Sequence, residues 1–303
     1  MPCSNLRLLA AAAVAACTLA TQAQAALVFS LADDGSSLIR FDTATPGAVT
    51  TVGSVAGATT RLNGLDFRPS NGLLYGYSDF TGSVYTVDPS TGVTTLVSTL
   101  SIPTNTVILG IDFNPVPDRL RIVTASDQNL RVNVASGATT MDTNLAYAPG
   151  DPNAGAAPNP NIVDAAYTNS SLGVASSTKL YYIDHFTNSL VTTTLPNAGV
   201  LNTVGALGVD IDIFSGFDIF SNAGANNAFA QFRVGGVNGL YSINLATGAA
   251  TALGAIGNTS LMYGLAIVPG QLPEPGSLAL LGSAGLATLV VRRRQPVKSA
   301  QLA

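Results

Sequence analysis

The chain has 303 residues, of which 47% are apolar and only 10% are charged, whereas about 25% of residues are charged in an average globular protein. This length and apolar content can bury the core of one or two domains. Between Ala26 and Leu272 there are eight basic residues and sixteen Asp, a net charge of −8. Because a field of this sign repels phosphate groups, nucleic acid and anionic membrane surfaces are poor partners.

Residues 1–25 have the three parts of a secretory signal peptide. Arg7 gives a weak positive start, Leu8–Ala16 is apolar, and Ala23 and Ala25 form a small-x-small cleavage site before Ala26. Signal peptidase is therefore an expected partner.

Both cysteines of the chain precede this cleavage site. Val14–Cys17 also has the form of a lipoprotein signal, which would place a lipid on Cys17, but the later Ala-x-Ala site favours cleavage before Ala26. Because Cys3 is removed as well, the mature chain would have no thiol. A disulfide, a Cys-ligated metal and a Cys nucleophile are then excluded.

The body begins with a repeat of short strands, clearest between Leu62 and Leu100. Runs rich in β-branched and aromatic residues alternate there with Pro, Asn, Asp and Gly, which is typical of strands joined by tight turns. The expected strands are Leu62–Arg68, Leu73–Tyr77, Ser83–Val87 and Val93–Val97.

The same pattern of short strands and tight turns returns at intervals of about 45–55 residues, which indicates a repeat architecture. Units start at Leu62, Ile108, Ile162 and Gly216, whereas residues 27–55 hold only three strands and Leu261–Pro269 holds one. A lone first strand at the C-terminus complements a unit that lacks it. The sequence therefore predicts an all-β fold, a β-propeller of five or six four-stranded blades closed by joining both chain ends, with a β-helix or stacked sandwich as alternatives.

The segment Ala146–Asn161 interrupts this rhythm. Its density of Pro, Gly and Asn predicts that it does not pair in a sheet. We expect an ordered excursion over one face of the ring, with or without a binding role.

The C-terminal tail, residues 271–303, follows the domain at 26–270. Pro273-Glu274-Pro275 precedes the apolar stretch Gly276–Val291, and Arg292, Arg293 and Arg294 follow it. Sixteen residues span about 24 Å as a helix, short of a hydrocarbon core of about 30 Å but workable for a thin or transient span. The arginines would hold its end on the cytoplasmic side.

This tail resembles the PEP-CTERM sorting signal of Gram-negative bacteria. The resemblance implies recognition and cleavage by a membrane exosortase, transient anchoring at the inner membrane through the helix, and release to the cell surface or extracellular space. It also implies a link to exopolysaccharide and biofilm matrix.

The body resembles a secreted family, the domain of unknown function numbered 4394. The resemblance rests on GIDF at Gly110–Phe113, QNLRVN at Gln128–Asn133, and the stretch from Gly150 to Ser170. It implies a propeller-like fold and an exported protein, and it supplies no catalytic residues.

The best candidates for chemistry are Asp residues that recur on the first strand of each unit. They are Asp66, Asp112, Asp164 and Asp218, and the fifth unit has Ala266 instead. First strands of a propeller lie beside the central channel, where four carboxylates could surround a cation such as calcium or supply an acid/base pair for glycoside cleavage. Alternatively, each Asp accepts backbone hydrogen bonds and joins blade to blade. Repetition in every blade favours this packing role, because an active site is normally asymmetric.

Other polar motifs give weaker signals. Asp33–Ser36 resembles part of a calcium loop but lacks its ligand pattern, so a hairpin turn is expected. His185 is the only histidine, which argues against a zinc site, and no G-x-S-x-G motif supplies a nucleophile for a triad. The Tyr residues fall mostly inside strands, where core packing is expected.

Together these patterns predict an exported, exosortase-sorted protein that binds or scaffolds without catalysis and needs no cofactor. Its expected partner is an exopolysaccharide or a matrix protein. The alternative is a propeller enzyme that cleaves a carbohydrate or lactone with the four Asp, with or without calcium.

Overall fold

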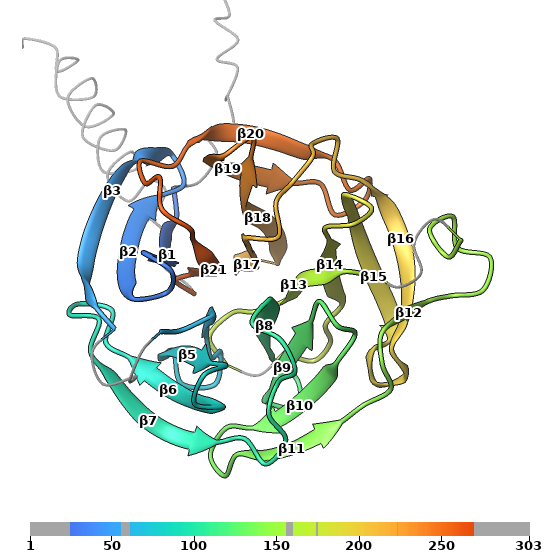
Figure 1. Ribbon diagram of the computed structural model, residues 1–303, viewed down its shortest axis with the longest axis horizontal. Helices are drawn as coiled ribbons and strands as arrows, with labels where there is room; N and C mark the ends of the chain where they lie inside the picture. Colours follow the sequence, from blue (N-terminus) through green and yellow to red (C-terminus); the bar gives the residue numbers. More distant parts are fainter. Residues whose placement is uncertain (1–24, 56–60, 156–159, 174, 223, 270–303) are drawn as a thin grey trace, which may run out of the picture.

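The computed structural model describes residues 25–55, 61–155, 160–173, 175–222 and 224–269. These residues form five sheets arranged as blades around a central axis (Figure 1). Apart from the short 3-10 helix η1, Pro196–Ala198, the described elements are all strands. The propeller prediction is confirmed with five blades, and the six-bladed ring, the β-helix and the stacked sandwich are wrong.

In each blade the strands follow one another from the axis outwards, and neighbouring strands of the repeat are antiparallel. Blade 1 contains β4 (Gly64–Phe67), β5 (Leu74–Ser78), β6 (Ser83–Val87) and β7 (Thr94–Thr99). Blade 2 contains β8 (Leu109–Asn114), β9 (Arg119–Thr124), β10 (Asn129–Asn133) and β11 (Ala138–Met141). Blade 3 contains β13 (Ile162–Tyr167), β14 (Leu180–Asp184), β15 (Ser189–Leu195), β16 (Val200–Ala206) and β12 (Ala146–Tyr147). Blade 4 contains β17 (Ser215–Asn222), β18 (Ala225–Val234), β19 (Val237–Ile243) and β20 (Ala250–Ala255).

Blade 5 closes the ring with strands from both ends of the body. The C-terminal strand β21 (Tyr263–Ile267) lies at the axis and is followed by β1 (Leu27–Ala32), β2 (Ser37–Asp42) and β3 (Thr45–Ser54). β21 pairs antiparallel with β1, with Phe29 opposite Ala266. The closure expected from the incomplete first and last units is therefore confirmed, and it leaves the inner strand of the ring paired.

The apolar core lies between the blades. Five clusters of buried hydrophobic side chains are found among the described residues, and each joins two neighbouring blades. Between blades 5 and 1, for example, Phe29 packs edge-on against Phe67 with ring centroids 5.9 Å apart. Because every strand alternates its side chains between two faces, each blade contributes to two clusters, and the ring is held rigid on both sides of each sheet.

The turns between third and fourth strands explain why the repeat is visible in the sequence. Three of them begin with Asp or Asn and end four residues later with Gly in a left-handed conformation, as in Asn133–Gly137. The Gly137 N–H donates to the Asn133 carbonyl at 2.8 Å. A Cβ on Gly137 would overlap the carbonyl oxygen of Thr99 in blade 1, so both its φ of +72° and the close contact require glycine.

The prediction that the segment 146–161 does not pair in a sheet is wrong for its first two residues. Ala146–Tyr147 does pair in a sheet, in parallel with β16, and forms the outermost strand of blade 3. Asp151 then accepts hydrogen bonds from the N–H and hydroxyl of Thr203, both at 2.7 Å. Residues 146–155 therefore lie at the outer edge of blade 3 (Figure 1), whereas Asn161 lies directly before the innermost strand β13.

The expected signal peptide, with Ala23, and the sorting tail, with its helix at 276–291, lie outside the described residues. Within the described residues, no helix has the length and apolar character needed to span a membrane.

Candidate functional site

The four recurring Asp residues occupy the innermost strands β4, β8, β13 and β17, as expected. We call Asp66, Asp112, Asp164 and Asp218 the Asp ring. Their exposed fractions are 6, 1, 4 and 5%, so all four carboxyl groups are buried along the axis. At the corresponding place in β21, Ala266 is fully buried and offers no carboxylate.

Three members of the Asp ring accept a hydrogen bond from the backbone of the next blade. Asp66 accepts from the Phe113 N–H at 2.7 Å, Asp112 from the Tyr167 N–H at 3.2 Å, and Asp218 from the Ile267 N–H at 2.7 Å. These bonds join blades 1 and 2, 2 and 3, and 4 and 5. Asp164 accepts from the Ala165 N–H of its own strand at 2.9 Å.

The junction between blades 5 and 1 lacks such a carboxylate and is packed differently. Gly264 has φ of +58°, and a Cβ on it would lie 2.9 Å from the Leu65 nitrogen. The Ser30 hydroxyl donates to the Gly264 carbonyl at 2.8 Å. The close approach of Gly264 to Leu65 therefore takes the place of the carboxylate at the junction between blades 5 and 1.

Burial raises the pKa of every member of the Asp ring, because a charged carboxylate loses its hydration there. Repulsion from Asp218 adds to the rise for Asp66, and repulsion from Asp66 adds to it for Asp112. For Asp218, burial raises the pKa to about 7 although the Ile267 N–H acts in the opposite direction. Full ionisation at neutral pH therefore needs a compensating positive charge.

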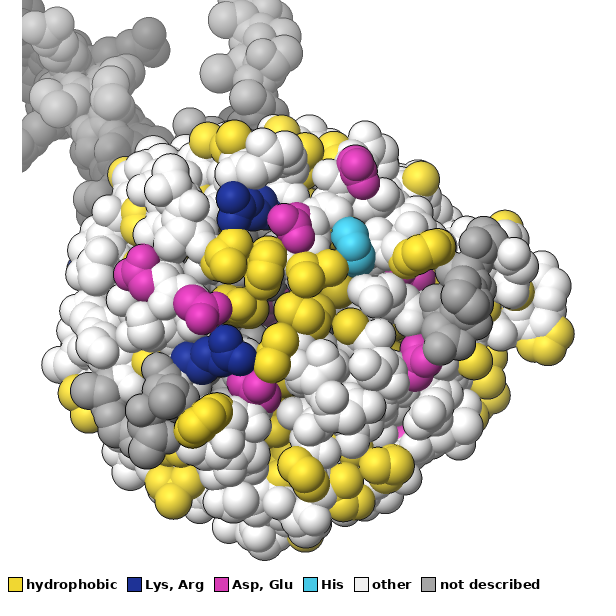
Figure 2. Space-filling view, viewed as in Figure 1, with side chains coloured by type: hydrophobic (Ala, Val, Ile, Leu, Met, Phe, Trp, Pro, Cys, Tyr) yellow, Lys and Arg dark blue, Asp and Glu magenta, His cyan; other side chains and the backbone are white. Residues whose placement is uncertain are grey.

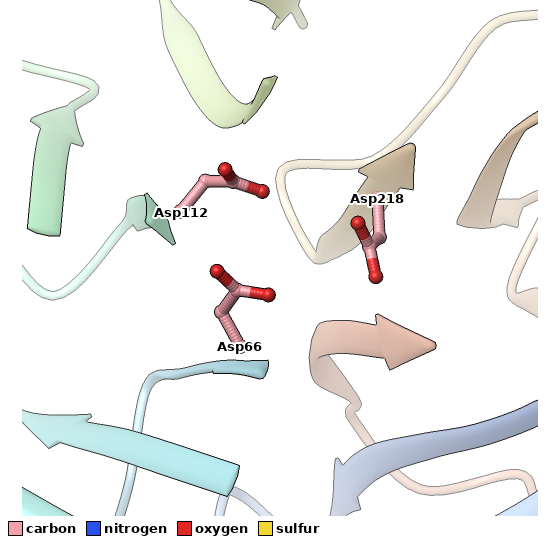
Figure 3. Close-up of side chains that lie close together, drawn as sticks. All are labelled: Asp66, Asp112 and Asp218. Atoms are coloured by element: carbon pink, nitrogen blue, oxygen red, sulfur yellow. The ribbon is translucent and has the colours of Figure 1, made fainter. Parts of the chain in front are cut away.

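Asp66, Asp112 and Asp218 are the residues that could hold a cation. Each offers one carboxylate oxygen, and these oxygens lie within 4.8 Å of one another; Figure 3 shows the three groups turned towards the same space from different blades. Two oxygens on opposite sides of a calcium ion are separated by about 4.6–5.2 Å, so the spacing is compatible. Calcium takes about six to eight oxygen ligands, however, and three carboxylates that bind through one oxygen each supply three, so further ligands would have to complete the shell.

Apolar side chains gather just before the innermost strands β8, β17 and β21. We call Ile108, Ile213, Phe214 and Leu261 the mouth patch; they are partly buried and pack on the core clusters around them. The Phe214 ring packs edge-on against Tyr263, with centroids 5.5 Å apart. Figure 2 shows hydrophobic groups around the centre of one face, with charged groups and the histidine around them.

The weaker polar candidates have structural roles. Asp33–Ser36 forms the turn between β1 and β2, with Asp33 and Asp34 at positive φ. His185 lies in the turn after β14, where its Nδ1 is 2.9 Å from the Ile211 carbonyl oxygen. Most of the tyrosines are buried in the core clusters, as predicted.

One polar site was missed by the sequence analysis, namely a cleft of about 340 Å³ on blade 2 beside blade 3. Its lining includes Arg119, Arg121 and Arg131, together with Tyr167 from β13. A signal was present, because three of the eight basic residues of the body fall within thirteen positions. Nothing in the sequence showed that they share one cleft.

Fold and site together define a closed five-bladed propeller with a buried acidic axis. The sequence profile of the family described as Domain of unknown function (DUF4394) matches residues 37–266, and the chain belongs to this family. The PEP-CTERM protein-sorting motif matches residues 271–294. The chain is thus an exported, exosortase-sorted surface or extracellular protein, as the tail predicted.

Comparison with curated proteins finds no match. Among solved structures, a nidogen/laminin complex is 13% identical with a TM-score of 0.49, and the match covers 82% of this chain and 99% of that one. A protein of unknown function from Bacteroides thetaiotaomicron VPI-5482 is 13% identical with a TM-score of 0.46, covering 82% and 68%. The computationally designed Ika8 protein is 9% identical with a TM-score of 0.36, covering 78% and 61%. Likeness at this level carries no information on ligand or activity.

Proposed function

We propose that the propeller is a non-catalytic binding or scaffold module of the cell surface or extracellular matrix, and that its partner is an exopolysaccharide or a matrix protein. The observation that carries this proposal is the exosortase sorting motif at residues 271–294, directly after a closed propeller. A rigid ring with two faces and no long unpaired inner edge suits binding without rearrangement.

The state of the Asp ring supports a role without catalysis. Catalytic carboxylates must reach their substrate, at hydrogen-bond distance or through one water. The ring members are at most 6% exposed, and Asp66, Asp112 and Asp218 already bond the backbone of the next blade. Their regular use at three blade junctions is the pattern of a packing device.

The proposal includes the processing of both ends. Signal peptidase would cut between Ala25 and Ala26, and the stretch 276–291 would hold the chain in the inner membrane until exosortase acts near Pro273–Pro275. The mature domain would then extend over about residues 26–270.

The alternative is a carbohydrate- or lactone-cleaving enzyme, with or without calcium, and one observation favours it. Asp66, Asp112 and Asp218 converge within 4.8 Å, and their raised pKa values are of the kind found in general acids. For this function the channel would have to open to substrate.

Turnover separates the two functions. The full-length chain in detergent is incubated with the exopolysaccharide of its host and with a panel of polysaccharides and lactones. We expect the exopolysaccharide to bind and to keep its length on size-exclusion chromatography. Shortening of a polymer or opening of a lactone, lost in Asp112→Asn but kept in Asp33→Asn, would falsify the non-catalytic role.

A further inference from the structure

Basic side chains of this acidic protein concentrate in the cleft of blade 2. Arg119, Arg121 and Arg131 line it, and among the described residues Asp142 is the only one whose carboxylate accepts hydrogen bonds from them. The carboxylate of the adjacent Asp118 is paired with Arg68 at 2.6 Å. The cleft therefore has a net positive charge within a body whose net charge is −8.

Arg121 is held in one orientation. It is 2% exposed, and its guanidinium donates to Asn129 and Asp142 at 2.7 Å and to Asn197 at 2.8 Å. Its Nε donates to the Tyr167 hydroxyl at 3.3 Å. Because the Arg121 guanidinium is buried and hydrogen-bonded on several sides, it places a fixed positive charge at the bottom of the cleft.

Arg131 offers donors to a ligand. Its Nε and Nη2 bind both oxygens of Asp142, at 2.7 and 2.8 Å. Its Nη1 has no hydrogen bond to another described residue. Burial acts against ionisation of Asp142, but the bonds from Arg131 and Arg121 outweigh it and lower the pKa of this carboxyl. The ion pair of Arg131 and Asp142 thus stays charged, and the Nη1 group of Arg131 remains available at the cleft.

The arrangement has a cost that packing does not explain. Arg121 and Arg131 are directly opposite each other on paired strands, and like charges in this position destabilise a sheet. Arg119, one pleat away on the same face of β9, adds a third positive charge and bonds only to the backbone of Pro117 and Asp118. One carboxylate carries less charge than three guanidinium groups, so the cleft keeps an excess of positive charge that suits an anionic ligand.

The rest of the lining indicates which anion. The side-chain amides of Asn114 and Asn197 can bond hydroxyl groups, while Pro117 and Pro196 present apolar surface. Guanidinium groups pair with carboxylates through two parallel hydrogen bonds. Apolar surface, amides and an arginine fork together match a sugar ring that carries a carboxylate.

We propose that this cleft binds carboxylate-bearing sugar units of an acidic polysaccharide. The inference rests on the proposed function, which it deepens by naming the class of partner and the face that meets it. Arg131 and Arg119 bind the carboxylate. Arg121 positions Arg131 through Asp142 and supplies a fixed positive charge.

The test compares polygalacturonate, carboxyl-reduced polygalacturonate and neutral dextran by isothermal titration calorimetry with the full-length chain in detergent. We expect polygalacturonate to bind at least about tenfold more tightly than its carboxyl-reduced form, because hydrogen bonds between charged groups are lost on reduction. Arg131→Gln should weaken binding of polygalacturonate about tenfold or more. Arg119→Gln, which removes an exposed side chain bonded only to nearby backbone, should also weaken it and tests the cleft without a risk to folding.

Arg40→Gln is the matched control, because Arg40 is exposed on β2 in blade 5 and its loss changes the net charge equally. Equal affinity for the native and carboxyl-reduced polymers, or equal effects of Arg119→Gln and Arg40→Gln, overturns the inference. Binding of the host exopolysaccharide that is unchanged in both cleft variants would leave the proposed function standing with a different site. Absence of binding to any polysaccharide would count against both.

Discussion

At the scale of residues, the Asp ring links protonation to stability. The pKa of an unfolded Asp is about 3.9, whereas burial raises that of Asp218 to about 7 in the fold. A raised pKa means that the folded state binds the proton more tightly. Stability from this group is therefore fully present below pH about 4 and is lost as the pH rises through about 7.

We accordingly predict that, in EDTA, the thermal midpoint falls between pH about 5.5 and about 8. The rise in pKa to about 7 corresponds to a loss on the order of 4 kcal/mol between pH about 4 and about 7, and about half of this loss falls above pH about 5.5. Asp218→Asn keeps an oxygen for the Ile267 N–H and removes one of the four buried carboxyls, so its midpoint should fall less over this range. Asp33→Asn, at an exposed turn, is the control. A midpoint that is flat or rises over this range contradicts the prediction.

Calcium tests whether a cation takes the place of the proton. Because a backbone N–H already occupies one oxygen of each carboxylate of Asp66, Asp112 and Asp218 and calcium takes about six to eight oxygen ligands, we expect calcium to leave the midpoint at pH about 8 within roughly one degree of its value in EDTA. Differential scanning calorimetry measures both. A rise with calcium that Asp112→Asn abolishes would make the Asp ring a metal site.

At the scale of elements, ring closure depends on the strand β21. Without it, the edge of β1 is unpaired, and the Asp218 carboxylate loses the Ile267 N–H. We predict that a chain ending before Tyr263 aggregates and loses cooperative unfolding, since an exposed strand edge recruits other chains. A chain ending after Pro269 is the control. Light scattering and calorimetry distinguish them, and cooperative unfolding of the shorter chain would contradict the role of β21.

The turn glycines give a second test at this scale. Gly137 and Gly150 both have positive φ, of 72° and 84°, but only Gly137 is packed against a neighbouring blade. Both alanine variants carry the strain of a positive φ, and only Gly137→Ala adds overlap with the Thr99 carbonyl, so it should cost about 1–3 kcal/mol more than Gly150→Ala. Urea unfolding of both variants measures the difference. Equal losses in the free energy of unfolding would show that this contact between blades 1 and 2 does not contribute to stability.

The elements could be predicted because their signals are local. Gly, Asp and Asn at turns and alternation within strands mark units such as Leu62–Leu100, and the lone strand at Leu261–Pro269 indicates closure. β12 escaped prediction because two residues, Ala146 and Tyr147, pair with β16, which follows about fifty positions later. Such a pairing leaves no local pattern.

The site could be predicted only in part, for a related reason. The repeat placed all four Asp on innermost strands, but which three converge depends on the geometry of the closed ring. The arginine cleft depends on the register that sets Arg131 opposite Arg121 and on η1, which brings Asn197 to Arg121 from blade 3. These are contacts between blades, and no spacing within one unit encodes them.

At the scale of the whole molecule, two regions of different charge share one rigid ring. The axis is acidic and buried, while the accessible cleft on blade 2 is basic. Because the blades are fixed by five apolar clusters, a partner can bind at the cleft without rearranging the axis. We therefore assign a structural role to the buried axis and the binding role to the cleft at the periphery of the ring.

Calorimetric unfolding of the full-length chain in detergent tests this separation most directly, with the exopolysaccharide of its host added in the presence of calcium or of EDTA. A ligand that binds only the folded state raises the unfolding midpoint as its site fills. We predict that the polysaccharide raises the unfolding midpoint by several degrees. This rise should be equal in calcium and in EDTA and should be retained in Asp112→Asn. No rise with the polysaccharide, together with a calcium-dependent rise that Asp112→Asn abolishes, would contradict the account and make the axis the functional site.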